Sequence, residues 1–103
     1  MELMIGNVSS LTLARIYDTP LYVYDKSVIL NRISQLKSSF PNANICYAVK
    51  ANSNPTILRL IASQGLGADC SNRTELEYSR RAGFDLSKSI VTSVNPKDVD
   101  LKV

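Results

Sequence analysis

Apolar residues recur along the chain at two different spacings, which separate the expected helices from the expected strands. Between residues 25 and 41, four of them follow one another at i, i+4, i+7 and i+11: Ile29, Ile33, Leu36 and Phe40. This spacing places them on one face of a helix. Asp25 or Ser27 can cap the start of that helix, and Pro41 is expected to end it.

Three later segments carry short apolar runs typical of buried strands: residues 45–49 (ICYAV), 66–70 (LGADC) and 89–94 (SIVTSV). A helix-start signal follows each of them: Asn54-Pro55, Asn72 with Glu75, and Asn95-Pro96. Gly65 and Gly83 are placed to end the first two of these helices. The series predicts an α/β fold with a parallel sheet and right-handed crossovers.

Residues 20–25 (PLYVYD) are rich in strand-forming residues and begin with proline, so we expect a strand there. It would lead into the strand–helix series, which divides the chain into an amino-terminal segment, 1–24, and a partial barrel domain, 25–103. A closed eight-stranded barrel takes ~200 residues or more. We therefore expect the 103 residues to be a piece of a longer protein.

Composition excludes several classes of function. The net charge is +3 and the twelve basic residues are spread along the chain, so no nucleic-acid-binding surface is expected. The chain has no histidine, and Cys46 and Cys70 lack the spacing of a metal site, so no metal is expected. There is neither a signal peptide nor an apolar run of ~20 residues, which favours a soluble cytoplasmic protein.

Lys50 and Asp69 stand at the ends of neighbouring expected strands, where functional groups gather in α/β folds. Strand alternation puts Lys50 on the same side as Ala48, whose small side chain leaves room for a flat molecule. A partly desolvated lysine amine can form a Schiff base with an aldehyde, and a nearby carboxylate can orient it. The two residues could equally form a structural ion pair, or be unrelated surface charges.

The stretch YAVKANSNPTILRLIASQGLGADCSNRTELEYSRRAGF contains both residues, with TPLYVYD upstream and TSVNPK downstream. In the order and spacing of these motifs, residues 19–97 resemble the decarboxylases that depend on pyridoxal 5'-phosphate (PLP) and have the alanine-racemase-like fold. This is the ornithine/diaminopimelate/arginine decarboxylase family. The resemblance implies an incomplete first part of a PLP-binding (β/α)8 barrel, which a β-rich second domain follows in family members.

The resemblance also implies roles for three residues. Lys50 is expected to carry PLP as a Schiff base, Ala48 to be the small residue packed near the cofactor, and Asp69 to be the carboxylate beside both. The family's ring-stacking histidine, its glycine-rich phosphate site and the glutamate that faces the pyridine nitrogen have no counterpart in these 103 residues. The segment alone is therefore expected to be inactive.

Within the family, the similarity is greatest to the members that convert meso-diaminopimelate to L-lysine. The AN pair after Lys50 favours them over ornithine decarboxylases, whereas Asn72-Arg73 departs from the paired glycines common in them. Ornithine, arginine or carboxynorspermidine decarboxylase is the alternative, as is a non-catalytic decarboxylase-like protein or an inert piece of one. The expected partner is a small amino-acid substrate, and the full-length protein is expected to be a homodimer.

Overall fold

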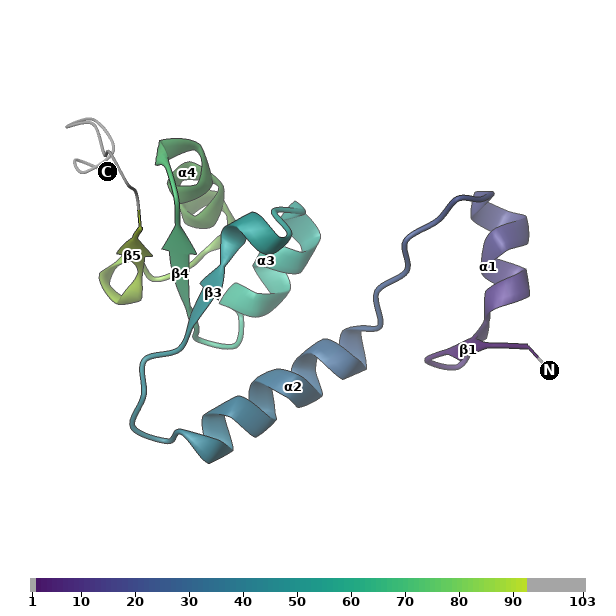
Figure 1. Ribbon diagram of the computed structural model, residues 1–103, viewed down its shortest axis with the longest axis horizontal. Helices are drawn as coiled ribbons and strands as arrows, with labels where there is room; N and C mark the ends of the chain where they lie inside the picture. Colours follow the sequence, from purple (N-terminus) through teal and green to yellow (C-terminus); the bar gives the residue numbers. More distant parts are fainter. Residues whose placement is uncertain (1, 93–103) are drawn as a thin grey trace. The chain divides into compact units, whose positions relative to one another are not determined.

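A computed structural model describes residues 2–92 of the chain. The chain divides after Ser39 into two compact units, which are considered one at a time (Figure 1). The predicted helix start at Asn95-Pro96 and the last two residues of the strand expected over 89–94 lie outside the described residues.

The first unit begins with a small hairpin that the sequence patterns did not indicate. Strand β1 (Met4–Ile5) pairs antiparallel with β2 (Val8–Ser9). Gly6 turns the chain between them at a φ of 60°, which favours glycine. Helix α1 (Ser10–Tyr17) follows directly, and the Ser9 hydroxyl caps it by accepting a hydrogen bond from the Leu11 amide at 3.2 Å.

Helix α2 (Lys26–Ser39) confirms the helix predicted between residues 25 and 41. Asp25 caps it, because its Oδ1 accepts hydrogen bonds from the amide and the hydroxyl of Ser27 at 2.9 and 2.7 Å. These hydrogen bonds lower the pKa of Asp25. Ile33 is the only buried residue of α2, although its apolar neighbours share the same spacing.

The strand predicted over residues 20–25 was wrong. Residues 21–25 have no regular structure, and Tyr22 is 89% exposed. Among the described residues, no strand pairs with this segment through ladder hydrogen bonds. Strand propensity reflects packing and pairing with neighbours, so without them the run of β-branched and aromatic residues forms no strand.

The second unit contains the parallel sheet that the sequence predicted. Strands β3 (Cys46–Ala48), β4 (Gly67–Cys70) and β5 (Ile90–Val91) lie in that order, and both neighbouring pairs are parallel. The register pairs Ala48 with Asp69, and Asp69 with Ile90. Each strand is shorter than the apolar run that predicted it.

Helices α3 (Pro55–Ala62) and α4 (Arg73–Ala82) contact each other beside the sheet (Figure 1). Asn54 caps α3 by accepting from the Thr56 amide at 2.9 Å. The predicted cap of α4 is also present, with Asn72 accepting from the Glu75 amide at 2.9 Å. These local side-chain bonds fix where each helix leaves the strand before it.

Helix α4 ends as predicted at Gly83, whose φ of 96° is in the left-handed region. This turns the chain so that the amide of Phe84 bonds to the carbonyl of Ser79 at 3.1 Å. Phe84 thereby joins the core of this unit, whose buried apolar residues are Val49, Leu58, Ile61, Leu66, Ala68, Cys70, Leu76 and Phe84. This core holds the strand ends in place relative to the helices.

Candidate active site at the strand ends

Lys50 lies immediately beyond the end of β3. The strand stops at Ala48, and Val49–Ala51 form a single 3₁₀ turn. Val49 is fully buried in this turn, whereas Lys50 is exposed. We expected Lys50 on the same side as Ala48 from strand alternation, but the strand ends at Ala48, two residues before Lys50.

The turn that carries Lys50 is tied down on both sides. The Tyr47 hydroxyl donates to the carbonyl oxygen of Asn52 at 2.9 Å. The Asn52 side chain in turn accepts from the Asn54 amide at 3.0 Å, and Asn54 caps α3. These bonds connect the end of β3 to the start of α3, so Lys50 projects from a braced turn.

Ala48 and Asp69 are register partners on neighbouring parallel strands. Partner residues in a parallel pair point to the same face, so the alanine methyl group and the carboxylate lie side by side. The sequence predicted Lys50 and Asp69 at the ends of neighbouring strands, and the structure pairs Asp69 with Ala48. A small residue next to a carboxylate leaves open space in front of that carboxylate.

The Asp69 carboxylate bonds to Thr92 and not to Lys50. The Thr92 hydroxyl donates to Oδ1 of Asp69 at 2.6 Å. In the part of the chain that the structure describes, no hydrogen bond or ion pair joins Lys50 to Asp69. The alternative of a structural Lys50–Asp69 ion pair is thus not realised between these residues, and the amine has no bonded partner between residues 2 and 92.

Cys46 lies on the same strand face as Ala48, and its thiol donates to the carbonyl oxygen of Lys88 at 3.2 Å. Burial and the nearby Asp69 carboxylate raise the pKa of the Cys46 thiol. Burial likewise raises the pKa of Cys70. Both cysteines are free thiols, and a raised pKa favours the protonated form, which is the less reactive one.

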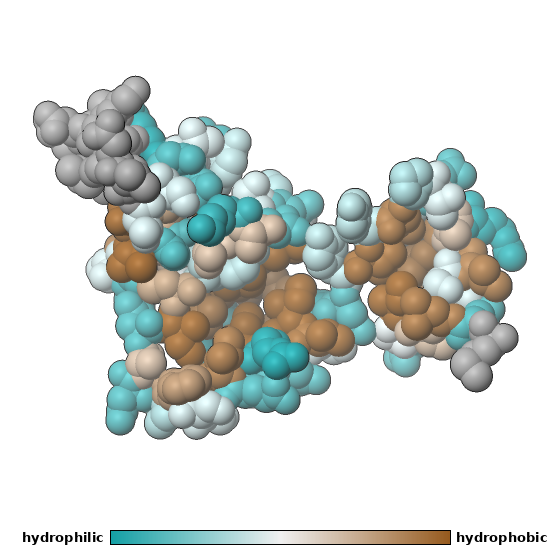
Figure 2. Space-filling view, in the orientation of Figure 1, coloured by the Kyte–Doolittle hydropathy of each residue, from teal (hydrophilic) through white to brown (hydrophobic). Residues whose placement is uncertain are grey.

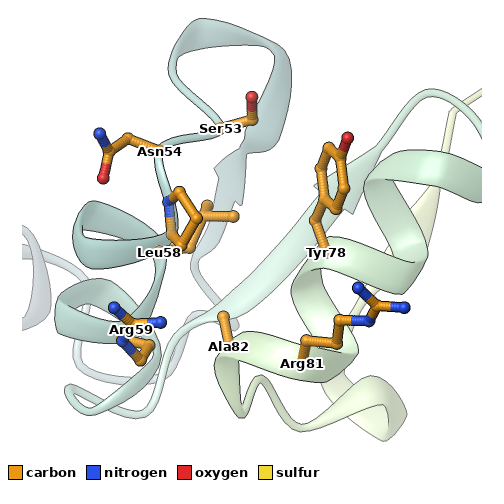
Figure 3. A pocket seen from close by; sticks show the side chains of 8 residues that line it. Ser53, Asn54, Leu58, Arg59, Tyr78, Arg81 and Ala82 are labelled. Atoms are coloured by element: carbon orange, nitrogen blue, oxygen red, sulfur yellow. The ribbon is translucent and has the colours of Figure 1, made fainter.

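A separate pocket of about 460 Å³ lies between α3 and α4 (Figure 3). Tyr78 and Arg81 of α4 face Leu58 and Arg59 of α3 across it. Neither Lys50 nor Asp69 lines this pocket, so it is not part of the strand-end site. Sequence patterns did not indicate this pocket, because its lining depends on how two helices separated by strand β4 pack against each other.

The donor set at the strand ends suits an aldehyde cofactor and does not suit a metal. Lys50 offers a primary amine with no bonded partner in the described segment, and Asp69 offers a carboxylate held by one hydrogen bond. An amine forms an imine with an aldehyde and releases water. No group of three histidine, cysteine, aspartate or glutamate side chains within residues 2–92 is arranged to hold a metal ion.

The chain is similar to known decarboxylases. It is 39% identical to a diaminopimelate decarboxylase of Aquifex aeolicus over 97% of this chain and 24% of that protein. A solved structure from Aquifex aeolicus superposes with a TM-score of 0.92 at 39% identity, covering 97% of this chain and 25% of that one. The diaminopimelate decarboxylase of Helicobacter pylori, solved in complex with L-lysine, gives a TM-score of 0.80 at 32% identity, over 88% of this chain and 24% of that one.

The chain thus spans about a quarter of the length of these relatives. Their fold confirms the predicted class, the incomplete first part of an alanine-racemase-like barrel. The family model for the pyridoxal-binding domain of the pyridoxal-dependent decarboxylases matches residues 26–102. Because this match takes in most of the sequence, the chain belongs to the pyridoxal-dependent decarboxylases and carries part of their pyridoxal-binding domain.

Proposed function

We propose that the longer protein containing this chain is a PLP-dependent decarboxylase that converts meso-diaminopimelate to L-lysine. The observation that carries the proposal is the position of Lys50. Its amine is exposed at the carboxyl end of a parallel strand, on a braced turn, with no bonded partner among the described residues.

Three residues of this chain divide the work at the cofactor. Lys50 would hold PLP covalently through its ε-amine. Ala48, beside Asp69 on the same face, leaves room for the cofactor to approach the sheet closely. Asp69 would orient the amine and take part in moving its proton when substrate exchanges with Lys50. PLP, once bound, supplies an electron sink for the carbanion that remains when carbon dioxide leaves.

Diaminopimelate is the proposed substrate for two reasons. Two relatives that are 39% and 37% identical to the chain are diaminopimelate decarboxylases, and the diaminopimelate decarboxylase of Helicobacter pylori was solved with L-lysine bound. The AN pair after Lys50 also favours diaminopimelate over ornithine. Arginine and carboxynorspermidine are the remaining candidates, and a panel of the four amino acids with the complete protein separates them by carbon dioxide release.

Attachment of PLP to Lys50 is the decisive test. Borohydride reduction of the complete protein with PLP, followed by peptide mapping, should leave the pyridoxyl group on the peptide that contains Lys50. Lys50→Ala should abolish covalent attachment. Lys88→Ala is a matched control, because Lys88 is also exposed in the second unit but precedes β5. A pyridoxyl group on another lysine would refute the proposed role.

The proposal extends to a homodimeric protein of the cytoplasm. In residues 2–92, no helix has the length and apolar character needed to cross a membrane. Light scattering of the complete protein tests the dimer, and fractionation of the source cells tests the location. A monomer with full activity would remove the dimer from the proposal without affecting the chemistry.

A further inference from the structure

We propose that Thr92 is a positioning residue that fixes the Asp69 carboxylate for work beside the cofactor, an inference that rests on the function proposed above. Asp69 lies on β4 and Thr92 directly follows β5, 23 residues later in the sequence, and their side-chain oxygens are separated by only 2.6 Å. A hydroxyl that donates to a carboxylate at this distance forms a short, charge-assisted hydrogen bond. Such bonds are stronger than those between neutral groups.

Thr92 is itself firmly placed. Its amide donates to the Cys70 carbonyl at 2.8 Å, which continues the β4–β5 ladder one residue past Val91. Its side chain then turns back to Asp69, the residue before Cys70. Backbone and side chain of Thr92 thus bond to the same end of β4. As a β-branched residue, threonine has few accessible rotamers, which favours one fixed direction of the hydroxyl.

This arrangement assigns different roles to the two carboxylate oxygens. Oδ1 of Asp69 is occupied by Thr92, which restricts rotation of the carboxylate. Oδ2 accepts no hydrogen bond within residues 2–92, so it is open to an incoming group. The register partner of Asp69 is Ala48, whose methyl group does not obstruct that space.

Thr92 therefore acts through Asp69. Its hydroxyl touches the carboxylate, and in the described residues it bonds neither to Lys50 nor to any other side chain. Without this hydroxyl, the Asp69 carboxylate would have no hydrogen-bonded partner between residues 2 and 92 and could rotate about its own side-chain bond. The expected consequence is weaker orientation of PLP at Lys50, with the fold unchanged.

The test compares Thr92→Val, which removes the hydroxyl at nearly constant shape, with Thr92→Ser, which keeps it. In the complete protein, Thr92→Val should raise the dissociation constant of PLP roughly 3- to 10-fold, the range expected for one hydrogen bond. Thr92→Ser should stay within about 2-fold of the wild type, since the same bond can form. The urea midpoint of each variant shows whether the fold itself has changed.

A double-mutant cycle shows whether Thr92 acts through Asp69. In an Asp69→Ala background, Thr92→Val should cause no further loss of PLP affinity. An equal loss in both backgrounds would overturn the inference, as would a Thr92→Val protein that binds PLP like the wild type while Asp69→Ala does not.

A crystal structure of the cofactor-free Thr92→Val protein gives a readout that does not depend on PLP. The Asp69 carboxylate should adopt a different or multiple orientation there, and an unchanged single orientation would also overturn the inference. Failure of the wild-type protein to bind PLP would instead refute the proposed function.

Discussion

The carbonyl oxygen of Lys88 lies so close to Gly67 that a Cβ atom on residue 67 would overlap it. The same Cβ would lie 3.0 Å from the Cys46 sulfur. Gly67 is the first residue of β4, and Lys88 lies two residues before the start of β5. This contact is therefore at the end of the sheet where the strands begin. Lys50 and Asp69 are at the other end of the sheet, where β3 and β4 terminate. The close approach at Gly67 therefore serves packing rather than chemistry.

Gly67→Ala should accordingly destabilise the protein by about 1–3 kcal/mol, the usual cost of forcing extra atoms into a packed interior. The atom in the way belongs to the backbone, which cannot swing aside as a long side chain can. Urea unfolding of the complete protein measures the loss. PLP attachment to Lys50 should persist in the folded fraction. A variant with the wild-type midpoint would show that the turn before β5 yields easily.

Asp69→Asn tests the carboxylate without removing its volume. The amide oxygen can still accept from Thr92, so the fold should be intact and the urea midpoint close to that of the wild type. The negative charge that we propose to lie beside PLP is lost, and decarboxylation should slow by 10-fold or more, about 1.4 kcal/mol of barrier. Single-turnover kinetics with saturating PLP measure this step. Unchanged turnover would exclude Asp69 from the mechanism.

Asn72 caps α4 by accepting a hydrogen bond from the Glu75 amide, and the Glu75 carboxylate accepts a second one from the Ser71 amide at 2.7 Å. Asn72→Ala removes the cap and should lower the free energy of unfolding by about 1 kcal/mol. Asn72→Asp retains an acceptor and adds a negative charge at the helix start, so it should be close to neutral. Equal losses in the two variants would mean that the cap bond is not what Asn72 contributes.

The helix caps could be predicted because their causes are local, and the parallel strands because three apolar runs, each followed by a helix-start signal, supply partners for one another. Asn54, Asn72 and Gly83 act within a few residues of themselves, so their positions relative to apolar runs are sufficient. The strand expected over residues 20–25 failed for the opposite reason, since a strand requires a partner that sequence alone does not provide.

The candidate site residues also differ in how far the sequence predicted their arrangement. That β3 and β4 are neighbouring parallel strands follows from the strand–helix order, and the sequence predicted it, whereas the register that pairs Ala48 with Asp69 comes from the structure. The bond between Thr92 and Asp69 depends on the register of a third strand, which the sequence does not specify. One signal was present: Thr92 is a hydroxyl residue within the strand expected over 89–94, and the structure places it directly after the end of β5.

Glu77 makes stability depend on pH in acid. Hydrogen bonds from Arg80 and Arg81, with the Arg80 bond the stronger influence, lower its pKa from 4.5 to about 2. The folded protein binds a proton on Glu77 less readily than the unfolded chain does. The contribution of Glu77 to the free energy of unfolding is therefore complete above pH 4.5 and is lost as the pH falls towards 2. Glu77→Gln should therefore flatten the stability profile in that range.

Thermal unfolding of the wild type and Glu77→Gln at low salt, from pH 5 to about pH 2, measures the difference. Glu77, Arg80 and Arg81 are at least one-third exposed, so the difference in stability between the two proteins should be small. It should shrink further in roughly 0.5 M salt, where charges are screened. Parallel profiles for the two proteins at low salt would show that the Glu77 cluster contributes nothing to folding.

The 103-residue segment expressed alone should neither unfold cooperatively nor decarboxylate diaminopimelate. Several large apolar or aromatic side chains are more than half exposed: Leu3, Met4, Leu11, Ile16, Tyr17, Tyr22, Tyr24, Val28, Phe40 and Ile90. Figure 2 shows hydrophobic residues at the surface of both units. Ile33 is the one buried apolar residue described in the first unit. The few buried apolar side chains of the segment are not expected to offset the entropy lost when the chain becomes ordered.

The sheet adds a second reason. Among the described residues, β3 and β5 each pair with a strand on one side only, and unpaired edges of this kind promote association between chains. Circular dichroism should therefore show a broad thermal transition, and light scattering should show aggregates that grow with concentration. A sharp two-state transition, together with micromolar PLP binding and carbon dioxide release from diaminopimelate, would contradict this prediction. The strand-end residues would then be sufficient for the chemistry without the remaining barrel.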